Sequence, residues 1–242
     1  RRLAHEIKNP LTPIRLSAER MRHKLLPSIK DEKDAQMLER ATETIVQQVE
    51  AMKEMVNAFS EYARAPRLEM APVELNHLVQ EVTDLYRAQD PERRVRLQLE
   101  LDPALGRVAA DPGRLRQLLH NLLTNAVEAL EGQSGGEVVV ATRLVERSGD
   151  AAAELTVADN GPGFQRELVG QVFDPYVTTK AKGTGLGLAI VRKIVEEHGG
   201  SIEADNRAEG GARIRIVLPM NDRKAASARA DVRKFEPRRE RA

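Results

Sequence analysis

The sequence predicts an α+β protein in which an antiparallel helical hairpin, paired into a dimeric four-helix bundle, precedes an α/β sandwich. Residues 1–64 carry a helical period and almost no strand signal, whereas helices and strands alternate after residue 72. The chain of 242 residues is long enough for two small domains. We therefore expect a hairpin at residues 1–65, a linker at 66–72, a second domain at 73–220 and a charged tail at 221–242.

The first region contains two amphipathic helices. Its apolar residues recur every seven positions on two tracks in each helix: Ile7, Ile14 and Met21 beside Leu11, Ala18 and Leu25, then Leu38, Ile45, Met52 and Phe59 beside Thr42, Val49, Val56 and Ala63. A polar break at 27–34 separates the helices. Because a lone hairpin leaves much of its apolar surface in water, we expect two copies to pair about a two-fold axis as a homodimer.

The second region alternates helix and strand. Pro66 and Pro72 mark the linker because proline lacks a donor and biases its predecessor away from helix. Asp111-Pro112 predicts an N-cap and first turn for a helix that runs to about residue 130. The remaining pattern predicts helices at 74–90 and 185–198, the latter ended by two glycines, and strands at 95–101, 138–145, 154–158, 201–204 and 212–218.

Composition excludes several classes of protein. Lysine and arginine number 38 against 37 aspartate and glutamate, so there is no global basic field that would indicate nucleic acid as the main partner. The absence of cysteine excludes disulfides, thiolate metal sites and cysteine nucleophiles. No apolar run is long enough for a membrane helix, and no signal-peptide pattern leads the chain. We expect a cytoplasmic location, and a disordered tail after residue 220 with a basic docking arm as the alternative.

The opening string "HEIKNP" places a histidine opposite the apolar stripe. At helical spacing His5 lies about 170° from the mean direction of the stripe formed by Leu3, Ile7, Leu11 and Ile14, and Asn9 follows one turn later. Glu6 can hold one imidazole nitrogen and leave the other free as a nucleophile. Pro10 frees the Glu6 carbonyl and tends to bend the helix there. The alternative is an ordinary surface histidine beside a frayed first turn.

Two glycine-rich strings indicate a phosphate site. "DNGPG" at 159–163 follows an apolar strand, and "GTGLGL" at 183–188 precedes a helix whose first amides lack intrahelical partners. Neither is a Walker loop, because no lysine-serine or lysine-threonine pair follows the last glycine. Each string alone also fits a purely structural turn.

A third string, "NLLTNAVEA" at 121–129, places Asn121 and Asn125 on one helix face. Asparagine is an indifferent helix former, so two on one face need an explanation. Their amide oxygens suit Mg²⁺ and their amide groups can bond phosphate. The alternative is a buried polar pair that ties the helix to a loop.

The ordered set "HEIKNP", "NLLTNAVEA", "DNGPG", "FDPYVTTK" and "GTGLGL" closely resembles the H, N, G1, F and G2 boxes of two-component sensor histidine kinases. The resemblance covers residues 1 to about 220. The opening twenty residues are similar to NtrY-type nitrogen-regulation sensors, with NtrB-type kinases next nearest. The resemblance of the whole motif set implies that the sandwich has the GHKL (Bergerat) ATPase fold, which is shared with gyrase, Hsp90 and MutL.

The resemblance implies a role for each boxed residue. His5 would accept phosphate, Glu6 would act as its polarising base, and Asn9 would orient water for dephosphorylating a partner regulator. Asn125 would ligate Mg²⁺ and Asn121 would support the phosphates of ATP. The expected activity is that of a protein-histidine kinase, with transfer to the receiver aspartate of an NtrX- or NtrC-like response regulator.

The same resemblance implies the rest of the nucleotide site. Asp159 would accept the adenine amino group, and Gly161 and Gly163 would shape the pocket wall. Phe173 would anchor a lid at 164–182. The remaining candidates for contact with the triphosphate lie at the end of the F box and in the G2 box: Lys180, Gly183, Thr184, Gly185, Leu186 and Gly187.

Two other functions remain open from the sequence. One is a stand-alone ATPase that releases phosphate steadily without a phosphoprotein, and the other is a non-catalytic module that binds nucleotide for stability. Because the first helix starts only four residues before His5, we expect that a sensor and signal-transmission segment with an inner-membrane anchor precedes this piece in the intact protein. For His198, which precedes two glycines, we expect an imidazolium that caps a helix C-terminus.

Overall fold

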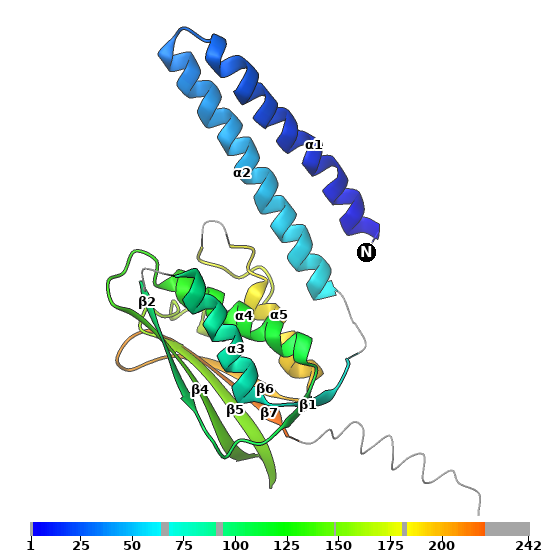
Figure 1. Cartoon of the computed structure of the whole chain (residues 1–242), viewed down its shortest axis with the longest axis vertical. Coiled ribbons are helices and arrows are strands. Elements are labelled where there is room, and N and C mark those ends of the chain that lie inside the picture. Colours follow the sequence, from blue (N-terminus) through cyan, green and yellow to red (C-terminus); the bar gives the residue numbers. More distant parts are fainter. Residues whose placement is uncertain (1, 64–67, 91–93, 148, 181–182, 221–242) are drawn as a thin grey trace, which may run out of the picture. The chain divides into compact units, whose positions relative to one another are not determined.

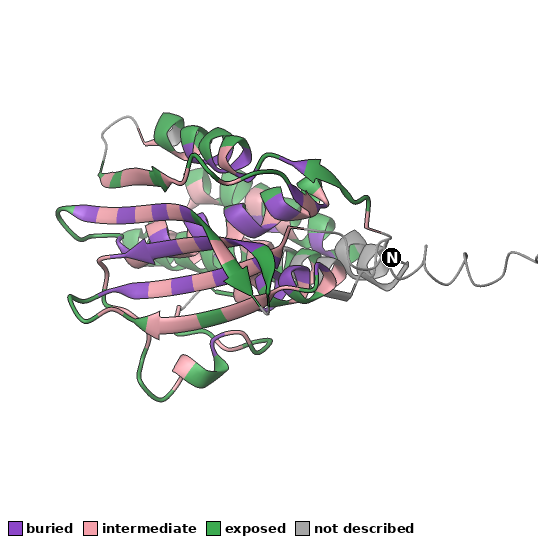
Figure 2. Cartoon of the chain, turned by 90° about the horizontal axis from the view of Figure 1, so that it is seen from below, coloured by how far each residue is buried: buried purple, intermediate pink, exposed green. Residues whose placement is uncertain are grey.

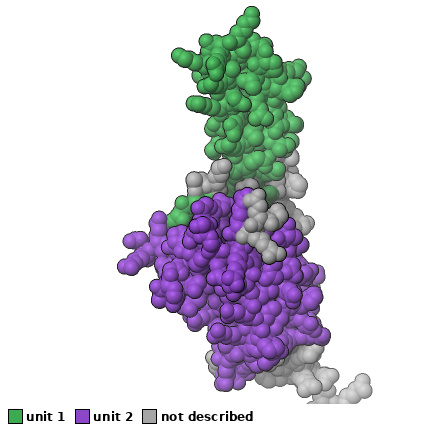
Figure 3. All heavy atoms as spheres, turned by 60° about the vertical axis from the view of Figure 1, so that its left-hand side comes forward, with its two compact units in different colours: residues 1–66, 174–190 green, residues 67–173, 191–242 purple. Residues whose placement is uncertain are grey.

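The computed structural model describes residues 2–63, 68–90, 94–147, 149–180 and 183–220, with the backbone alone at 2–9, 54, 58, 61–63 and 89. The predicted tail therefore lies outside the described residues. The chain divides into two compact units, residues 1–66 with 174–190 and residues 67–173 with 191–242 (Figure 3). Within the described residues, no helix combines the length and the apolar character that crossing a bilayer requires.

The first unit contains the predicted hairpin. Helix α1 (Arg2–Leu25) runs without a break through Pro10 and Pro13, and a single 3-10 turn, η1 (Leu26–Ser28), leads to the antiparallel helix α2 (Glu32–Ala63) (Figure 1). The Asp31 carboxylate accepts the backbone N–H of Lys33 at 2.9 Å and of Asp34 at 3.1 Å, which caps α2. The polar break predicted from sequence is thus the turn of the hairpin.

The two apolar tracks of the hairpin have different environments. One track closes the contact between the two helices: Leu11, Ala18, Thr42 and Val49 on it are 1–6% exposed, whereas Leu25, at the end of α1, is 47% exposed. The other track is 37–51% exposed: Ile14, Met21, Ile45, Met52 and Phe59. A single hairpin therefore buries one seven-residue track and leaves the other in water.

The second unit is built on a five-stranded mixed sheet of order β2-β4-β5-β7-β6. Strand β2 pairs with β4 in parallel and all other neighbours are antiparallel. The strands are β2 (Val95–Leu101), β4 (Gly136–Arg147), β5 (Asp150–Asp159), β6 (Ser201–Asn206) and β7 (Ala212–Pro219). Along β7 buried and half-buried residues alternate (Figure 2), so one face of the sheet belongs to the core.

Three helices cover that face: α3 (Leu75–Gln89), α4 (Pro112–Ala129) and α5 (Gly187–Glu197) (Figure 1). The predicted N-cap of α4 is confirmed, because the Asp111 carboxylate accepts the backbone N–H of Arg114 at 3.1 Å. The predicted end of α5 is also confirmed: Gly199 has φ +70°, and the Gly200 N–H reaches the Val195 carbonyl at 2.9 Å. Helix α5 begins two residues later than expected.

Three short elements escape the sequence pattern. Strand β1 (Ala71–Val73) pairs antiparallel with β3 (Val108–Ala110), and η2 (Val169–Gln171) is a single 3-10 turn. Ala71 and Pro72, which the sequence prediction gives to the linker, therefore lie in a strand. Pro72 is tolerated because β1 is an edge strand with one neighbour. Three residues are too few to show an alternating period.

Candidate functional site

Asp159 ends β5 and its carboxylate is held in a fixed orientation. The side chain is 6% exposed, and Oδ1 accepts the backbone N–H of Gly161 at 2.9 Å and of Ala212 at 3.1 Å. Among the residues that the structure describes, both of these bonds end on Oδ1, which leaves the lone pairs of Oδ2 to a donor on a ligand. A fixed acceptor of this kind suits an exocyclic amino group.

The glycines that follow Asp159 are required by close packing. A Cβ on Gly161 would lie 3.0 Å from Asp159 Oδ1 and 3.2 Å from the carbonyl oxygen of Ala129, at the end of α4. Gly163 has φ +75°, and a Cβ there would lie 2.7 Å from Asn206 Oδ1. The predicted pocket-wall glycines therefore let the loop approach both α4 and β6.

Asn160 is a site residue that sequence reasoning missed, although it lies inside the string "DNGPG". Its Oδ1 accepts the Glu137 N–H at 2.7 Å, and its Nδ2 donates to the Gly135 carbonyl at 3.0 Å. This two-point contact ties the loop after Asp159 to the start of β4. The tendency of asparagine side chains to bond neighbouring loop backbone was the available signal.

Asn121 and Asn125 lie one turn apart on α4, as predicted, and both are partly exposed. The opposite face of the helix is buried through its leucines, including Leu119 and Leu123. The Nδ2 atom of Asn121 is buried and has no hydrogen-bond partner among the described residues. An unpaired buried amide donor costs about 1–3 kcal/mol, so a native structure that keeps one calls for a bound acceptor.

The predicted G2 loop is packed against the residues of the F box. The carbonyl of Gly185 accepts the Tyr176 N–H at 2.9 Å. Gly185 has φ +66°, and a Cβ on it would lie 2.5 Å from the Tyr176 carbonyl carbon. A Cβ on Gly183 would lie 2.5 Å from Thr178 Oγ1. Both glycines are therefore fixed by local contacts within residues 174–190, a requirement that the motif spacing alone does not reveal.

The other predicted residues of this loop have distinct surroundings. The backbone of Lys180 donates to Thr178 Oγ1 at 3.1 Å and accepts the Gly183 N–H at 3.1 Å. Thr184 Oγ1 accepts a hydrogen bond from the backbone of Leu186, with 3.4 Å between the oxygen and the amide nitrogen. The side chain of Leu186 is fully buried. Gly187 is the first residue of α5, where backbone amides lack intrahelical partners.

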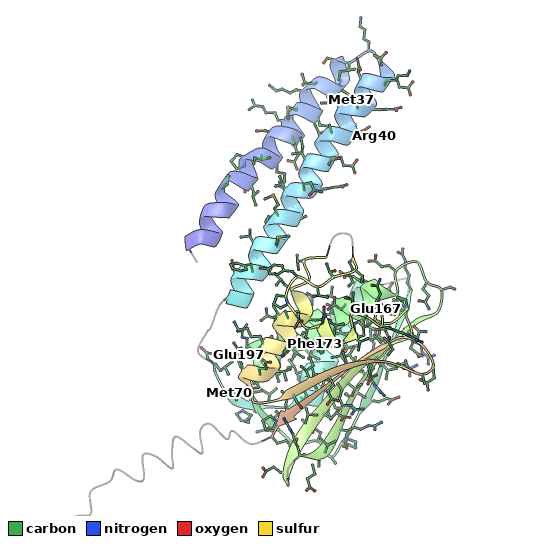
Figure 4. The ribbon with its side chains drawn as sticks, turned by 180° about the vertical axis from the view of Figure 1, so that it is seen from behind. Met37, Arg40, Met70, Glu167, Phe173 and Glu197 are labelled. Atoms are coloured by element: carbon green, nitrogen blue, oxygen red, sulfur yellow. The ribbon has the colours of Figure 1, made fainter. Side chains whose placement is uncertain are left out.

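Phe173, labelled in Figure 4, follows η2 and is half-buried beside the buried Val172. The backbones of His5, Glu6 and Asn9 lie in α1, as predicted. The side chains of these three lie outside the described residues. The solvent-facing orientation of the imidazole therefore stays a prediction.

Comparison with known proteins is consistent with this arrangement. Residues 1–67 match the model of the His Kinase A (phospho-acceptor) domain, and residues 110–222 match that of the Histidine kinase-, DNA gyrase B-, and HSP90-like ATPase. The chain is 39% identical over 231 residues to nitrogen regulation protein NtrY of Azorhizobium caulinodans. The aligned region covers 93% of this chain and 29% of that relative. The chain spans about a third of the length of this relative and of two NtrY-like sensor histidine kinases from Rickettsia, 29–37% in the three.

Solved structures give the same result. Full-length ShkA in complex with AMPPNP aligns with a TM-score of 0.66 and 26% identity, over 90% of this chain and 44% of that one. Histidine kinase ThkA in complex with response regulator protein TrrA aligns with a TM-score of 0.66 and 31% identity, over 91% and 60%. The separate catalytic domain of ThkA is 34% identical with a TM-score of 0.56, over 63% of this chain and 96% of that domain. The chain belongs to the sensor histidine kinases, with a helical phosphoacceptor hairpin followed by an ATPase domain of the GHKL fold.

Proposed function

We propose that this chain is the kinase core of a two-component system, which transfers the γ-phosphoryl group of ATP to His5 and then to an aspartate of a response regulator. The observation that supports it best is the buried carboxylate of Asp159, with Oδ1 held by two backbone N–H groups and Oδ2 left to accept the adenine amino group. Family membership supplies the expectation that the paired hairpin carries the phosphoacceptor.

The triphosphate would extend from Asp159 toward α4. Asn121 Nδ2, which is buried and has no hydrogen-bond partner in the described part of the chain, would donate to a phosphate oxygen. In this proposal Gly183, Gly185 and Gly187 contact phosphate oxygens, with Lys180 and Thr184 as further contacts. Backbone amides at the start of α5 suit such anionic oxygens.

The site suits Mg²⁺ at Asn125. An asparagine carbonyl is a hard oxygen ligand, and the proposed phosphates would complete the coordination. When bound, the ion would neutralise charge on the transferring phosphoryl group. The contribution of the chain is to hold the amide oxygen of Asn125 on the same helix face as Asn121.

The transfer itself needs a nucleophile from the hairpin. A neutral imidazole nitrogen of His5 would attack the γ-phosphorus while the bond to the β-phosphate oxygen breaks and ADP leaves. Glu6 would accept a hydrogen bond from the other ring nitrogen and stabilise the charge that develops on the ring. In the second step the regulator carboxylate attacks phosphorus and the P–N bond breaks. Asn9 would orient water for the opposing phosphatase reaction on the regulator.

The proposed kinase works as a homodimer. The exposed seven-residue track of the hairpin, from Ile14 to Phe59, needs a second apolar surface, and a second copy supplies an identical one. The response regulator is proposed by analogy with ThkA, whose structure was solved with a regulator bound. An NtrX- or NtrC-like regulator is the expected partner.

Phosphohistidine chemistry tests the proposal directly. The wild-type protein is incubated with γ-labelled ATP and Mg²⁺, and the label on protein is measured after acid and after base. We expect base-stable, acid-labile label on the wild type and none on His5→Gln. His23→Gln is the matched control, because His23 is an exposed histidine on the same helix.

The alternatives give different results. Steady phosphate release without labelled protein would indicate a stand-alone ATPase of the GHKL class. Nucleotide binding with neither product would indicate a non-catalytic module. Equal label on His5→Gln and wild type would exclude His5 as the phosphoacceptor.

A further inference from the structure

The loop that follows Asp159 is held by the β-hairpin that strands β6 and β7 form, at residues 206–212. These residues lie more than 40 positions further along the chain. Asn206, the last residue of β6, makes two hydrogen bonds to the backbone of one loop residue. Its Oδ1 accepts the Phe164 N–H at 2.7 Å and its Nδ2 donates to the Phe164 carbonyl at 2.8 Å. A side-chain amide here pairs with a backbone unit as a neighbouring strand would.

The same hairpin also contacts Asp159 at the other end of the loop. Arg207 Nη1 donates to the Asp159 backbone carbonyl at 3.1 Å, and the Ala212 N–H donates to the Asp159 carboxylate at 3.1 Å. Gly211 has φ +94°, and a Cβ on it would lie only 1.9 Å from the Asp159 carbonyl oxygen. No side chain can therefore replace the hydrogen of Gly211 without moving Asp159.

The packing of Gly163 depends on the same contact. A Cβ at Gly163 would lie 2.7 Å from Asn206 Oδ1 and 3.3 Å from the Gly211 carbonyl oxygen. The glycine at this position thus makes room for the Asn206 side chain. Both ends of the loop, at Asp159 and at Phe164, are fixed to residues 206–212.

We infer that Asn206 is a positioning residue for nucleotide recognition, and that residues 206–212 act as a clamp that orients the Asp159 carboxylate toward adenine. The inference rests on the proposed function, because it names what holds the adenine acceptor of that site. Asn206 itself does not touch the nucleotide. It acts through Phe164 and the loop, and Ala212 acts through the oxygen of Asp159 that faces away from the ligand.

If residues 206–212 act as this clamp, disrupting it should reduce the preference for adenine nucleotides and leave the rate of phosphoryl transfer at saturating ATP unchanged. With Asn206→Ala the loop loses both bonds at Phe164, and Asp159 samples orientations in which Oδ2 no longer meets the amino group. We expect the Kd for AMPPNP to rise about tenfold, the equivalent of about 1.4 kcal/mol. Guanine has a carbonyl oxygen at the position of the adenine amino group, so the Kd for GMPPNP should change by less than about twofold. The preference for AMPPNP over GMPPNP therefore becomes smaller.

An isosteric variant separates hydrogen bonding from packing. Asn206→Asp keeps the size of the side chain and an acceptor for the Phe164 N–H, but it places a carboxylate oxygen against the Phe164 carbonyl. We expect it to weaken AMPPNP binding at least as much as Asn206→Ala. Glu203→Ala is the matched control on the same strand, since the Glu203 side chain is 75% exposed, and it should bind as the wild type does.

Calorimetric titration of AMPPNP and GMPPNP into the four proteins, with melting temperatures and His5 labelling at saturating ATP, tests the inference. Both Asn206 variants should label His5 near the wild-type rate once ATP saturates. Unchanged AMPPNP affinity in Asn206→Asp, an equal loss for AMPPNP and GMPPNP, or a defect that saturating ATP does not restore would each overturn the clamp. A wild type that fails to bind AMPPNP or to label His5 would instead refute the proposed function.

Discussion

The imidazole of His198 accepts a hydrogen bond from the backbone N–H of Asp111, with 3.0 Å between Nε2 and the amide nitrogen. Its Nδ1 lies 2.7 Å from the Ile194 carbonyl oxygen, which only accepts, so Nδ1 carries the proton. The ring is therefore the neutral Nδ1–H tautomer. It caps the C-terminus of α5, as predicted, but it is 6% exposed and acts as an acceptor rather than as the predicted imidazolium.

Asp111 joins three segments of the second unit. Its own N–H is bonded to His198, its Oδ1 caps α4 at Arg114, and its Oδ2 accepts the Glu69 N–H at 3.0 Å. Glu69 lies just before β1. The start of α4, the end of α5 and the segment before β1 are thus linked through one residue.

Removal of the His198 ring should destabilise the ATPase domain. His198→Ala leaves the Asp111 N–H without an acceptor in a buried site, so we expect the free energy of unfolding to fall by about 1–3 kcal/mol. Urea unfolding measures the change, with His77→Ala on the exposed face of α3 as the control. A loss no larger than that of the control would show that water replaces the imidazole at no cost.

Asp111 should also make stability depend on pH. Partial burial raises the pKa of its carboxyl group, but the N–H groups of Glu69, Arg114 and Gly113 outweigh this and lower the pKa below the ordinary value of 3.8. Because the folded-state pKa is lowered, the stabilisation is present above the unfolded pKa and is lost as pH falls through the folded one. Wild type and Asp111→Asn should therefore differ most in urea midpoint well above the ordinary pKa of 3.8 and converge as the pH falls below 3.8 through the lowered folded-state pKa. Asp84→Asn on α3 serves as control, and a constant difference across this range would contradict the assignment.

Long periodic elements could be predicted from sequence because each carries its own signal. The seven-residue tracks of the hairpin predicted α1 and α2, and Asp111-Pro112 predicted the start of α4. The tracks did not show which one a single hairpin buries, because that depends on how α1 meets α2. Strands β1 and β3 were missed, since three residues have no measurable period.

The candidate site likewise contains residues that local sequence strings predicted and residues that depend on contacts between distant segments. The spacing of Asn121 and Asn125, and the glycines after Asp159, were visible as local strings. The contact of Asn206 with Phe164 joins residues 42 positions apart and leaves no pattern in either segment. A contact of this kind follows from the turn between β6 and β7, which only the folded sheet brings to Asp159.

Gly163 should not tolerate a methyl group. Gly163→Ala combines φ +75° with a Cβ that lies 2.7 Å from Asn206 Oδ1, so we expect the loop to shift and AMPPNP affinity to fall at least tenfold. Gly170→Ala is the matched control, because a Cβ there has no atom within 4 Å and its φ is not in the left-handed region. Equal affinities in the two variants would show that the loop absorbs the methyl group without moving Asp159.

The exposed track should decide the oligomeric state. Met52 is 51% exposed on the track that we assign to the dimer, whereas Met37, labelled in Figure 4, is 70% exposed and lies off both tracks. Met52→Glu would bury a charge in the proposed four-helix core, so we expect sedimentation to show a monomer at micromolar concentration. Met37→Glu should remain a dimer. Dissociation of both variants, or of neither, would contradict the assigned seam.

Replacement of Asn121 should weaken nucleotide binding without lowering the stability of the nucleotide-free protein. In Asn121→Ala the buried amide that lacks a partner is removed and the best helix former takes its place, so the nucleotide-free protein should melt at the same temperature as the wild type or slightly higher. A ligand that binds only the folded state raises the melting temperature by an amount that grows with the logarithm of its affinity, so the rise that ATP and Mg²⁺ produce in the wild type should be clearly smaller in the variant. Arg116→Ala, at an exposed position of the same helix, should keep that rise. A variant that melts several degrees lower without nucleotide, yet keeps the full ATP shift, would mean that Asn121 serves the fold and that the phosphates are bound elsewhere.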